Sequence, residues 1–207
     1  TTTVAGVRIF KSFPTVARIA LPASNNLSNG TQDLFRFSIT ANAAGQVSVN
    51  RINLKVATTS VLLTAATGKV IVYSDAGFST VIGGGFTNGE VATGLTFVDP
   101  IGGLDISFSA PVHIPSGTTY YFKVVNDITG VDAAGDSISS KLAGDATPTY
   151  TVVQDFTGAD ADAEDDFVWS GNTNGTPVAA TVDWFNGNQI VGLPTSDTDA
   201  STNTRAN

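Results

Sequence analysis

The chain has 207 residues, of which 42% are apolar and only 14% are charged, and its net charge is −8. This length and apolar content exclude a largely disordered chain, and the negative charge argues against nucleic acid and anionic membranes as partners. Cysteine is absent, which excludes disulfides and cysteine-based zinc sites, and no apolar run is long enough for membrane insertion.

The N-terminal segment, residues 1–21, is predicted as a strand segment that stands apart from the rest. Val4–Leu21 is interpreted as two strands interrupted by Pro14, whose missing N–H places that point at a sheet edge or crossover. This strip can pair within its own domain, or it can add to the edge of another subunit's sheet and meet an acidic neighbour. The residues expected at such a subunit interface are Val4, Val7, Arg8, Ile9, Phe10, Lys11 and Phe13.

Residues 22–194 are predicted to form an all-β, immunoglobulin-like or jelly-roll-type β-sandwich, because short alternating apolar runs recur between Gly, Asn, Asp and Pro. In the predicted strand Val47–Val56 the apolar positions move from one face of the strand to the other, which predicts a bulge near Asn50-Arg51. Asn186-Gly187 predicts a tight hairpin between the last two strands. The predicted strands are Leu34–Thr40, Val47–Val56, Lys69–Ser74, Leu104–Ser109, Thr119–Val125, Ser137–Leu142, Tyr150–Val153, Phe167–Trp169, Val182–Phe185 and Gln189–Val191.

Five carboxylates lie within seven residues of the stretch GADADAEDDFVWS at 158–170: Asp160, Asp162, Glu164, Asp165 and Asp166. An EF-hand loop is excluded, because Asp165 stands where that motif has its glycine and Gly171 where it has its glutamate. A looser calcium site stays open, since adjacent carboxylates repel one another unless a cation joins them. The alternative is a solvated loop before a strand.

The residue types that carry enzyme chemistry are sparse. His113 is the only histidine, lies between two prolines in APVHIP and is predicted as a surface or strand-edge residue. No Gly-x-Ser-x-Gly elbow is present, and one histidine cannot supply a three-nitrogen zinc site. Trp169 and Trp184 form a carbohydrate-stacking pair or, as we favour for at least one of them, fill the core. These patterns predict a protein that is not an enzyme.

The C-terminal tail, residues 195–207, is polar and is predicted to be mobile or to lie at an interface. Charge is divided along the chain: residues 1–74 carry seven bases against one acid (+6), and residues 75–207 carry three bases against seventeen acids (−14). Such a division suits head-to-tail stacking of copies, with drift in a solvated surface as the alternative. Methionine is absent, so we expect Thr1 to be a processed or trimmed N-terminus.

Three stretches carry a family resemblance: VRIFKSFPTVARIAL at 7–21 with LSNGTQDLFRFSITANAAGQVSVNRINLKVATTS at 27–60, IPSGTTYYFKV at 114–124, and DDFVWSGNTNGTPVAATVDWFNGNQIVGLP at 165–194. This combination resembles β-sandwich modules in secreted surface proteins of ultra-small candidate-phylum bacteria, and it covers nearly the whole chain. The resemblance implies an extracellular, non-catalytic cell-surface protein, and it brings no catalytic residues.

The favoured hypothesis is a structural subunit of an extracellular homopolymer, such as a filament, pilus-like fibre or sheath, whose partners are copies of itself. One alternative is a monomeric surface adhesin or carbohydrate-binding module for surface glycans, with Trp184 or Tyr121 as exposed aromatic residues. A surface-layer component and a hydrolase acting through the acidic stretch are the others. We expect no cofactor other than calcium.

Overall fold

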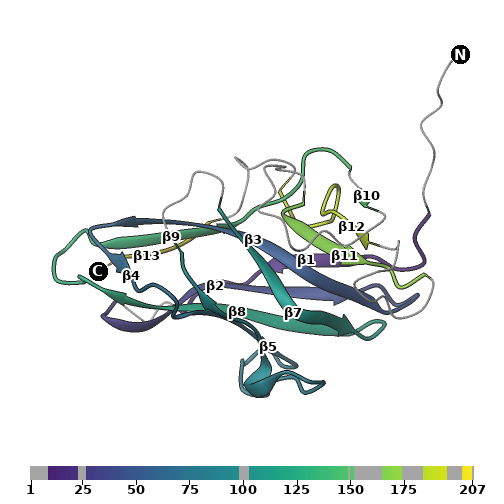
Figure 1. Cartoon of the computed structure of the whole chain (residues 1–207), viewed down its shortest axis with the longest axis horizontal. Helices are drawn as coiled ribbons and strands as arrows, with labels where there is room; N and C mark the ends of the chain where they lie inside the picture. Colours follow the sequence, from purple (N-terminus) through teal and green to yellow (C-terminus); the bar gives the residue numbers. More distant parts are fainter. Residues whose placement is uncertain are drawn as a thin grey trace, which may run out of the picture.

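The computed structural model describes residues 9–22, 27–97, 103–148, 150–151, 165–173, 184–194 and 202–206. These residues form two antiparallel sheets packed face to face (Figure 1), which confirms the all-β sandwich. None of the described residues belongs to a helix that is long and apolar enough to cross a membrane. The strands are β1 Pro14–Arg18, β2 Gly30–Ala41, β3 Val47–Thr59, β4 Leu62–Leu63, β5 Gly68–Tyr73, β6 Glu90–Leu95, β7 Leu104–Ile114, β8 Thr119–Thr129, β9 Ser137–Leu142, β10 Tyr150–Thr151, β11 Phe167–Ser170, β12 Trp184–Phe185 and β13 Thr202–Ala206, with a 3-10 turn η1 at Thr87–Gly89.

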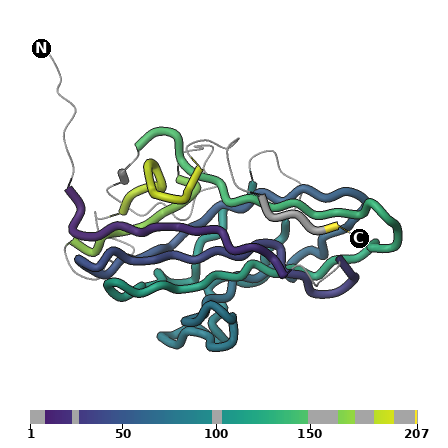
Figure 2. The backbone as a smooth tube through the Cα atoms, turned by 180° about the vertical axis from the view of Figure 1, so that it is seen from behind, coloured from purple at the N-terminus to yellow at the C-terminus, as the bar shows by residue number. Residues whose placement is uncertain are grey.

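Sheet A has the strand order β1-β2-β8-β5-β6, with β4 also paired to β8. Sheet B has the order β10-β12-β11-β3-β9-β13, with β7 also paired to β3. The long strands β2, β8 and β3 are central, and β1 runs along the edge of sheet A beside β2 (Figure 2). Pro14 begins this edge strand, where its missing N–H removes no bond from the sheet interior, as the sequence predicts.

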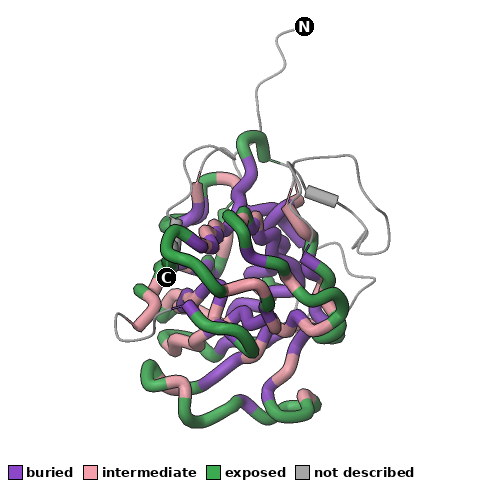
Figure 3. Tube along the Cα trace, turned by 90° about the vertical axis from the view of Figure 1, so that its left-hand side faces the viewer, coloured by how far each residue is buried: buried purple, intermediate pink, exposed green. Residues whose placement is uncertain are grey.

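The core lies between the two sheets, where buried residues concentrate (Figure 3). The alternation of β2 places Phe35, Phe37 and Ile39 on the inner face, as the sequence predicts, and each is at most 2% exposed. The Phe37 ring stacks on Phe122 of β8 at 4.8 Å between centroids, and Phe108 of β7 stacks on Phe122 at 6.2 Å. These rings join the two sheets through one continuous apolar layer.

The predicted bulge in β3 is confirmed. The register of β3 with β7 shifts between Val49 and Arg51, and the register with β11 shifts opposite the same two residues. Asn50 is therefore the extra residue that restores the apolar phase of the strand. The bulge turns Arg51 into a buried position, 1% exposed, beside the start of β11.

Two predictions at the C-terminal end are wrong. Asn186-Gly187 is no hairpin, since residues 188–193 form successive turns and Gln189–Val191 is not a strand. The Gly187 N–H donates to the buried Asp145 carboxylate instead of pairing across a hairpin. Residues 202–206 of the predicted mobile tail form β13, whose backbone pairs antiparallel with β9. Strand pairing needs no apolar side chain, which is why composition alone missed it.

Candidate functional site

The segment that leads into β1 is anchored by the aromatic ring of Phe10. This ring lies 5.1 Å from Trp169 and 4.7 Å from Phe185 between centroids, in tilted and edge-on geometries. Ser12 is fully buried, and its hydroxyl donates to the Gly45 carbonyl at 2.6 Å. This part of the N-terminal segment therefore packs within its own domain, as β1 does.

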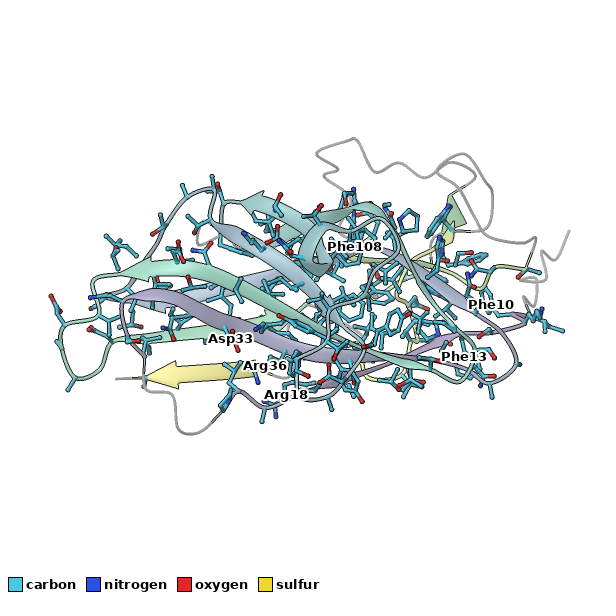
Figure 4. All side chains as sticks on the ribbon, turned by 90° about the horizontal axis from the view of Figure 1, so that it is seen from below. Phe10, Phe13, Arg18, Asp33, Arg36 and Phe108 are labelled. Carbon is cyan, nitrogen blue, oxygen red and sulfur yellow. The ribbon has the colours of Figure 1, made fainter. Side chains whose placement is uncertain are left out.

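Other side chains of the same segment face solvent. Ile9 is 87% exposed and Phe13 is 43% exposed, whereas Phe10 between them points into the fold at one end of the sandwich (Figure 4). Lys11 is also exposed. Of the residues expected at a subunit interface, Val4, Val7 and Arg8 lie outside the described residues. The structure thus separates an anchor, Phe10, from an exposed apolar residue directly before it.

The outer edge of β1 is covered by the turn that follows β12. The Val16 N–H donates to the Val191 carbonyl at 2.8 Å, and Pro14 has no N–H to offer. Gly192 follows with φ +91°, and a Cβ there would overlap the Val16 carbonyl oxygen. Only glycine combines this left-handed backbone with so close an approach. The β1 edge is therefore poorly suited to accept another strand.

Two acids of the acidic stretch have structural contacts. The Asp165 carboxylate forms an ion pair with the buried guanidinium of Arg51, and Asp166 is itself 5% exposed. A calcium ion at Asp165 would have to compete with Arg51. No group of three potential metal-ligating side chains occurs among the described residues. Asp160, Asp162 and Glu164 lie outside them, so calcium binding by this stretch stays a prediction.

The sequence analysis missed Asp145, a buried carboxylate after β9. Its oxygens accept the backbone N–H groups of Asp166 at 2.9 Å, Phe167 at 3.3 Å and Gly187 at 2.6 Å. Burial raises the pKa of Asp145 to about 7, and these donors oppose that rise. One carboxylate thereby holds the start of β11 and the turn after β12 together. Its only signal in the sequence is an acid in the short stretch between the Ser-rich strand β9 and a Thr-Pro pair.

Ion pairs inside the subunit neutralise part of the opposite charges carried by residues 1–74 and 75–207. Besides Arg51–Asp165, Lys69 pairs with Glu90 at 2.8 Å, which joins the basic and acidic parts of the sequence a second time. Asp33 accepts from Arg36 and lies 4.0 Å from Lys123, and Figure 4 shows Arg36 and Asp33 side by side. Fewer basic groups of residues 1–74 are thus left for a neighbouring copy than the sequence suggests.

Both tryptophans are core residues. Trp169 is 2% exposed and Trp184 is 1% exposed, and the Trp169 indole N–H donates to the Asn186 carbonyl at 2.8 Å. The interpretation that at least one tryptophan fills the core is confirmed, and the expectation of an exposed Trp184 is wrong. Tyr121 is half-buried beside Phe78, with 6.1 Å between ring centroids.

A groove of about 380 Å³ lies where β7 approaches the connection between β5 and β6. Its walls come from both sheets and from that connection: Ser74, Val81, Ile82, Phe86, Pro111, His113 and Tyr120 are among its lining residues. The His113 side chain is exposed, as predicted for a strand-edge residue.

A hydrogen-bond relay orients the His113 ring. Ser48 is fully buried, and its hydroxyl donates to Asn172 Oδ1 at 2.9 Å and lies 2.6 Å from His113 Nδ1. With the single hydroxyl proton donated to Asn172 Oδ1, the tautomer that fits has Nδ1 donating to Ser48 and Nε2 left as an acceptor. The residue as a whole is exposed, yet partial burial of its ring lowers the pKa of His113, which favours the neutral form of the ring.

Comparison with known proteins adds no relative. No protein-family model matches the chain, and no curated protein matches it. The fold therefore defines the class of protein, an all-β sandwich.

Proposed function

We propose that this protein is a non-catalytic structural subunit of an extracellular homopolymer, assembled by strand addition through its N-terminal segment. The observation that carries the proposal is the contrast between two adjacent residues. Phe10 is anchored on Trp169 and Phe185, whereas Ile9 is 87% exposed. An exposed isoleucine at the root of a segment that also contains Val4 and Val7 gains burial when a second copy covers it.

The anchor limits which residues a neighbour can receive. Pro14–Arg18 pairs with β2, and Ser12 is buried, so these residues stay with their own sandwich. Residues 1–9 are the donor, and Phe10 fixes the point at which the donor leaves the subunit. Arg8 and Lys11 flank the exposed Ile9, which suits an acidic partner surface, and the whole chain is acidic.

The contacts of the candidate catalytic groups support a role without catalysis. Asp165 is paired with Arg51, and Ser48, whose hydroxyl is bonded to His113, is fully buried. A nucleophile needs access to its substrate, which a buried hydroxyl does not have. These groups stabilise the fold instead.

A monomeric adhesin or carbohydrate-binding module is the second candidate, with a surface-layer component as a third. The groove favours the binding module, because Phe86 and Tyr120 offer aromatic surface beside His113 and Ser74. This alternative expects a monomer with or without the N-terminal residues.

Sedimentation velocity and negative-stain microscopy test the proposal. We expect the full chain to form large assemblies, and a variant lacking residues 1–9 to stay a folded monomer with an unchanged melting temperature. The matched control is Leu62→Asp, which changes another exposed apolar residue, 69% exposed on β4, and should still assemble. Assembly of the shortened variant would refute strand addition, and a monomeric full chain would refute the homopolymer.

A further inference from the structure

The groove lies between β7 of sheet B and the connection between β5 and β6. Val112 of β7 pairs with Val49, whereas Ser107 pairs with Arg51, so the residues between them, Phe108–Pro111, leave the regular register. Phe108 reaches sheet A and stacks on Phe122. Within the described part of the chain, β3 is the one strand that pairs with β7, and the other edge of β7 has no strand partner there.

The wall opposite β7 is formed by the connection between β5 and β6, which presents apolar side chains and, at its glycines, backbone without side chains. Val81 is 43% exposed and forms an isolated bridge with Tyr73, and Phe86 contributes a half-buried ring. A Cβ at Gly83 or Gly84 would meet nothing within 4 Å. A wall without side chains lets another backbone approach closely.

We propose that this groove is the acceptor for residues 1–9 of a second copy, a proposal that rests on the homopolymer function above. Ile9 and Val81 are both large apolar residues exposed in the single subunit, and one contact between copies would bury both. The β7 edge offers backbone groups to an added strand, and the groove offers space for its apolar side chains.

His113, one of the polar groups of the groove, fits this occupant. His113 holds its Nδ1 proton toward Ser48, so the ring atom left for a groove ligand is an acceptor, which suits a backbone N–H of an incoming strand. A neutral ring also does not repel Arg8 or Lys11 of the donor segment, whereas a cationic one would. The same acceptor would be a poor partner for an anion.

The location of the two surfaces fits a head-to-tail contact. Phe10 is anchored on β11 and β12 of sheet B, whereas the connection between β5 and β6 projects from the far side of sheet A (Figure 1). Donor and acceptor are then different surfaces of the same subunit. Contacts of this kind leave one donor and one acceptor open at the ends of each assembly, so chains grow.

Cysteine cross-linking tests the contact directly, because the chain contains no cysteine. The full-length variants Ile9→Cys and Val81→Cys are mixed under mild oxidation, and the product is identified by size and mass spectrometry. We expect a disulfide between two copies. The matched control mixes Ile9→Cys with Leu62→Cys, which should give at most a trace of product.

A charge in the groove gives the second test. We expect Val81→Asp to abolish the fast-sedimenting material while the melting temperature stays unchanged, and Leu62→Asp to leave it intact. Two results would show that the groove is not the acceptor: assembly of Val81→Asp as complete as that of the full chain, or equal cross-linking of Ile9→Cys to Val81→Cys and to Leu62→Cys. In either case, assembly of the full chain leaves the homopolymer proposal standing. If the full chain does not assemble and no cross-link forms, both proposals fall.

Discussion

Two glycine-containing loops border sheet edges in this sandwich, and they have opposite effects. The turn with Gly192 lies directly on β1, where Val191 accepts the Val16 N–H. The connection with Gly83 and Gly84 stands away from β7 and leaves a groove of about 380 Å³. The comparison teaches that a glycine can close an edge by close approach, or leave it open by lacking a side chain.

Each loop is also organised by one carboxylate, in contrasting environments. Asp145 is fully buried, and burial raises its pKa to about 7. Asp75 accepts the backbone N–H groups of Ser79 and Thr80 at the surface, and the bond from Thr80 is the main cause that lowers its pKa. Backbone N–H groups donate to both carboxylates, yet the two pKa values shift in opposite directions, because solvent is excluded from Asp145 and reaches Asp75.

The largest expected effect comes from replacing the glycine that closes the β1 edge. Gly192→Ala should destabilise the fold by about 3 kcal/mol or more, because the Cβ overlaps the Val16 carbonyl and φ is left-handed. Chemical denaturation measures the change. The matched control is Gly83→Ala, where no atom lies within 4 Å, and it should change stability by less than about 1 kcal/mol. Equal effects at the two glycines would contradict the comparison.

The ion pair that fixes the start of β11 should give the next largest effect. Asp165→Ala removes the carboxylate from the buried Arg51 guanidinium and should cost about 2–3 kcal/mol, measured by thermal and chemical unfolding. Glu90→Ala is the control, because its partner Lys69 is 42% exposed and such pairs contribute at most about 1 kcal/mol. A loss at Asp165 no larger than that at Glu90 would show that Arg51 does not depend on this partner.

The alternation of apolar side chains predicts most of this fold from sequence, whereas contacts between polar groups far apart in the chain leave no local pattern. The β2 pattern and the phase change at Asn50 are local signals, and both are confirmed. The role of Asp145 depends on Gly187, far along the chain, so no local pattern could show it. For the same reason Asn186-Gly187 predicts a hairpin that the structure does not contain. The groove also arises from parts distant in sequence, β7 and the connection after β5.

The Asp145 contacts should make stability depend on pH. Its folded-state pKa of about 7 lies above the ordinary aspartate value of 3.8, so the folded state binds more protons between these values. The contribution of Asp145 to stability is therefore fully present below about pH 4 and is lost as pH rises to about 7. Asp145→Asn removes this slope and leaves one backbone N–H without an acceptor, which costs about 2 kcal/mol.

Unfolding of the wild type and Asp145→Asn at a series of pH values checks this sign. The destabilisation caused by the substitution should be largest near pH 4–5 and should shrink by pH 8, where the wild-type carboxylate is ionised in a buried site. Ser79→Ala, which changes a hydrogen-bond partner of the surface residue Asp75, serves as a control that should not alter the slope over this range. A difference that grows with pH would contradict the burial argument.

The smallest expected effect on stability separates the anchor from the donor. Phe10→Ala should cost about 2 kcal/mol, because it removes a half-buried ring from Trp169 and Phe185. Ile9→Ser should cost less than about 0.5 kcal/mol, since the side chain is 87% exposed in the single subunit. Its effect should appear in assembly instead, as a smaller fast-sedimenting fraction. If Ile9→Ser is destabilised yet assembles normally, Ile9 belongs to the anchor, and the proposal that residues 1–9 act as a donor strand is contradicted.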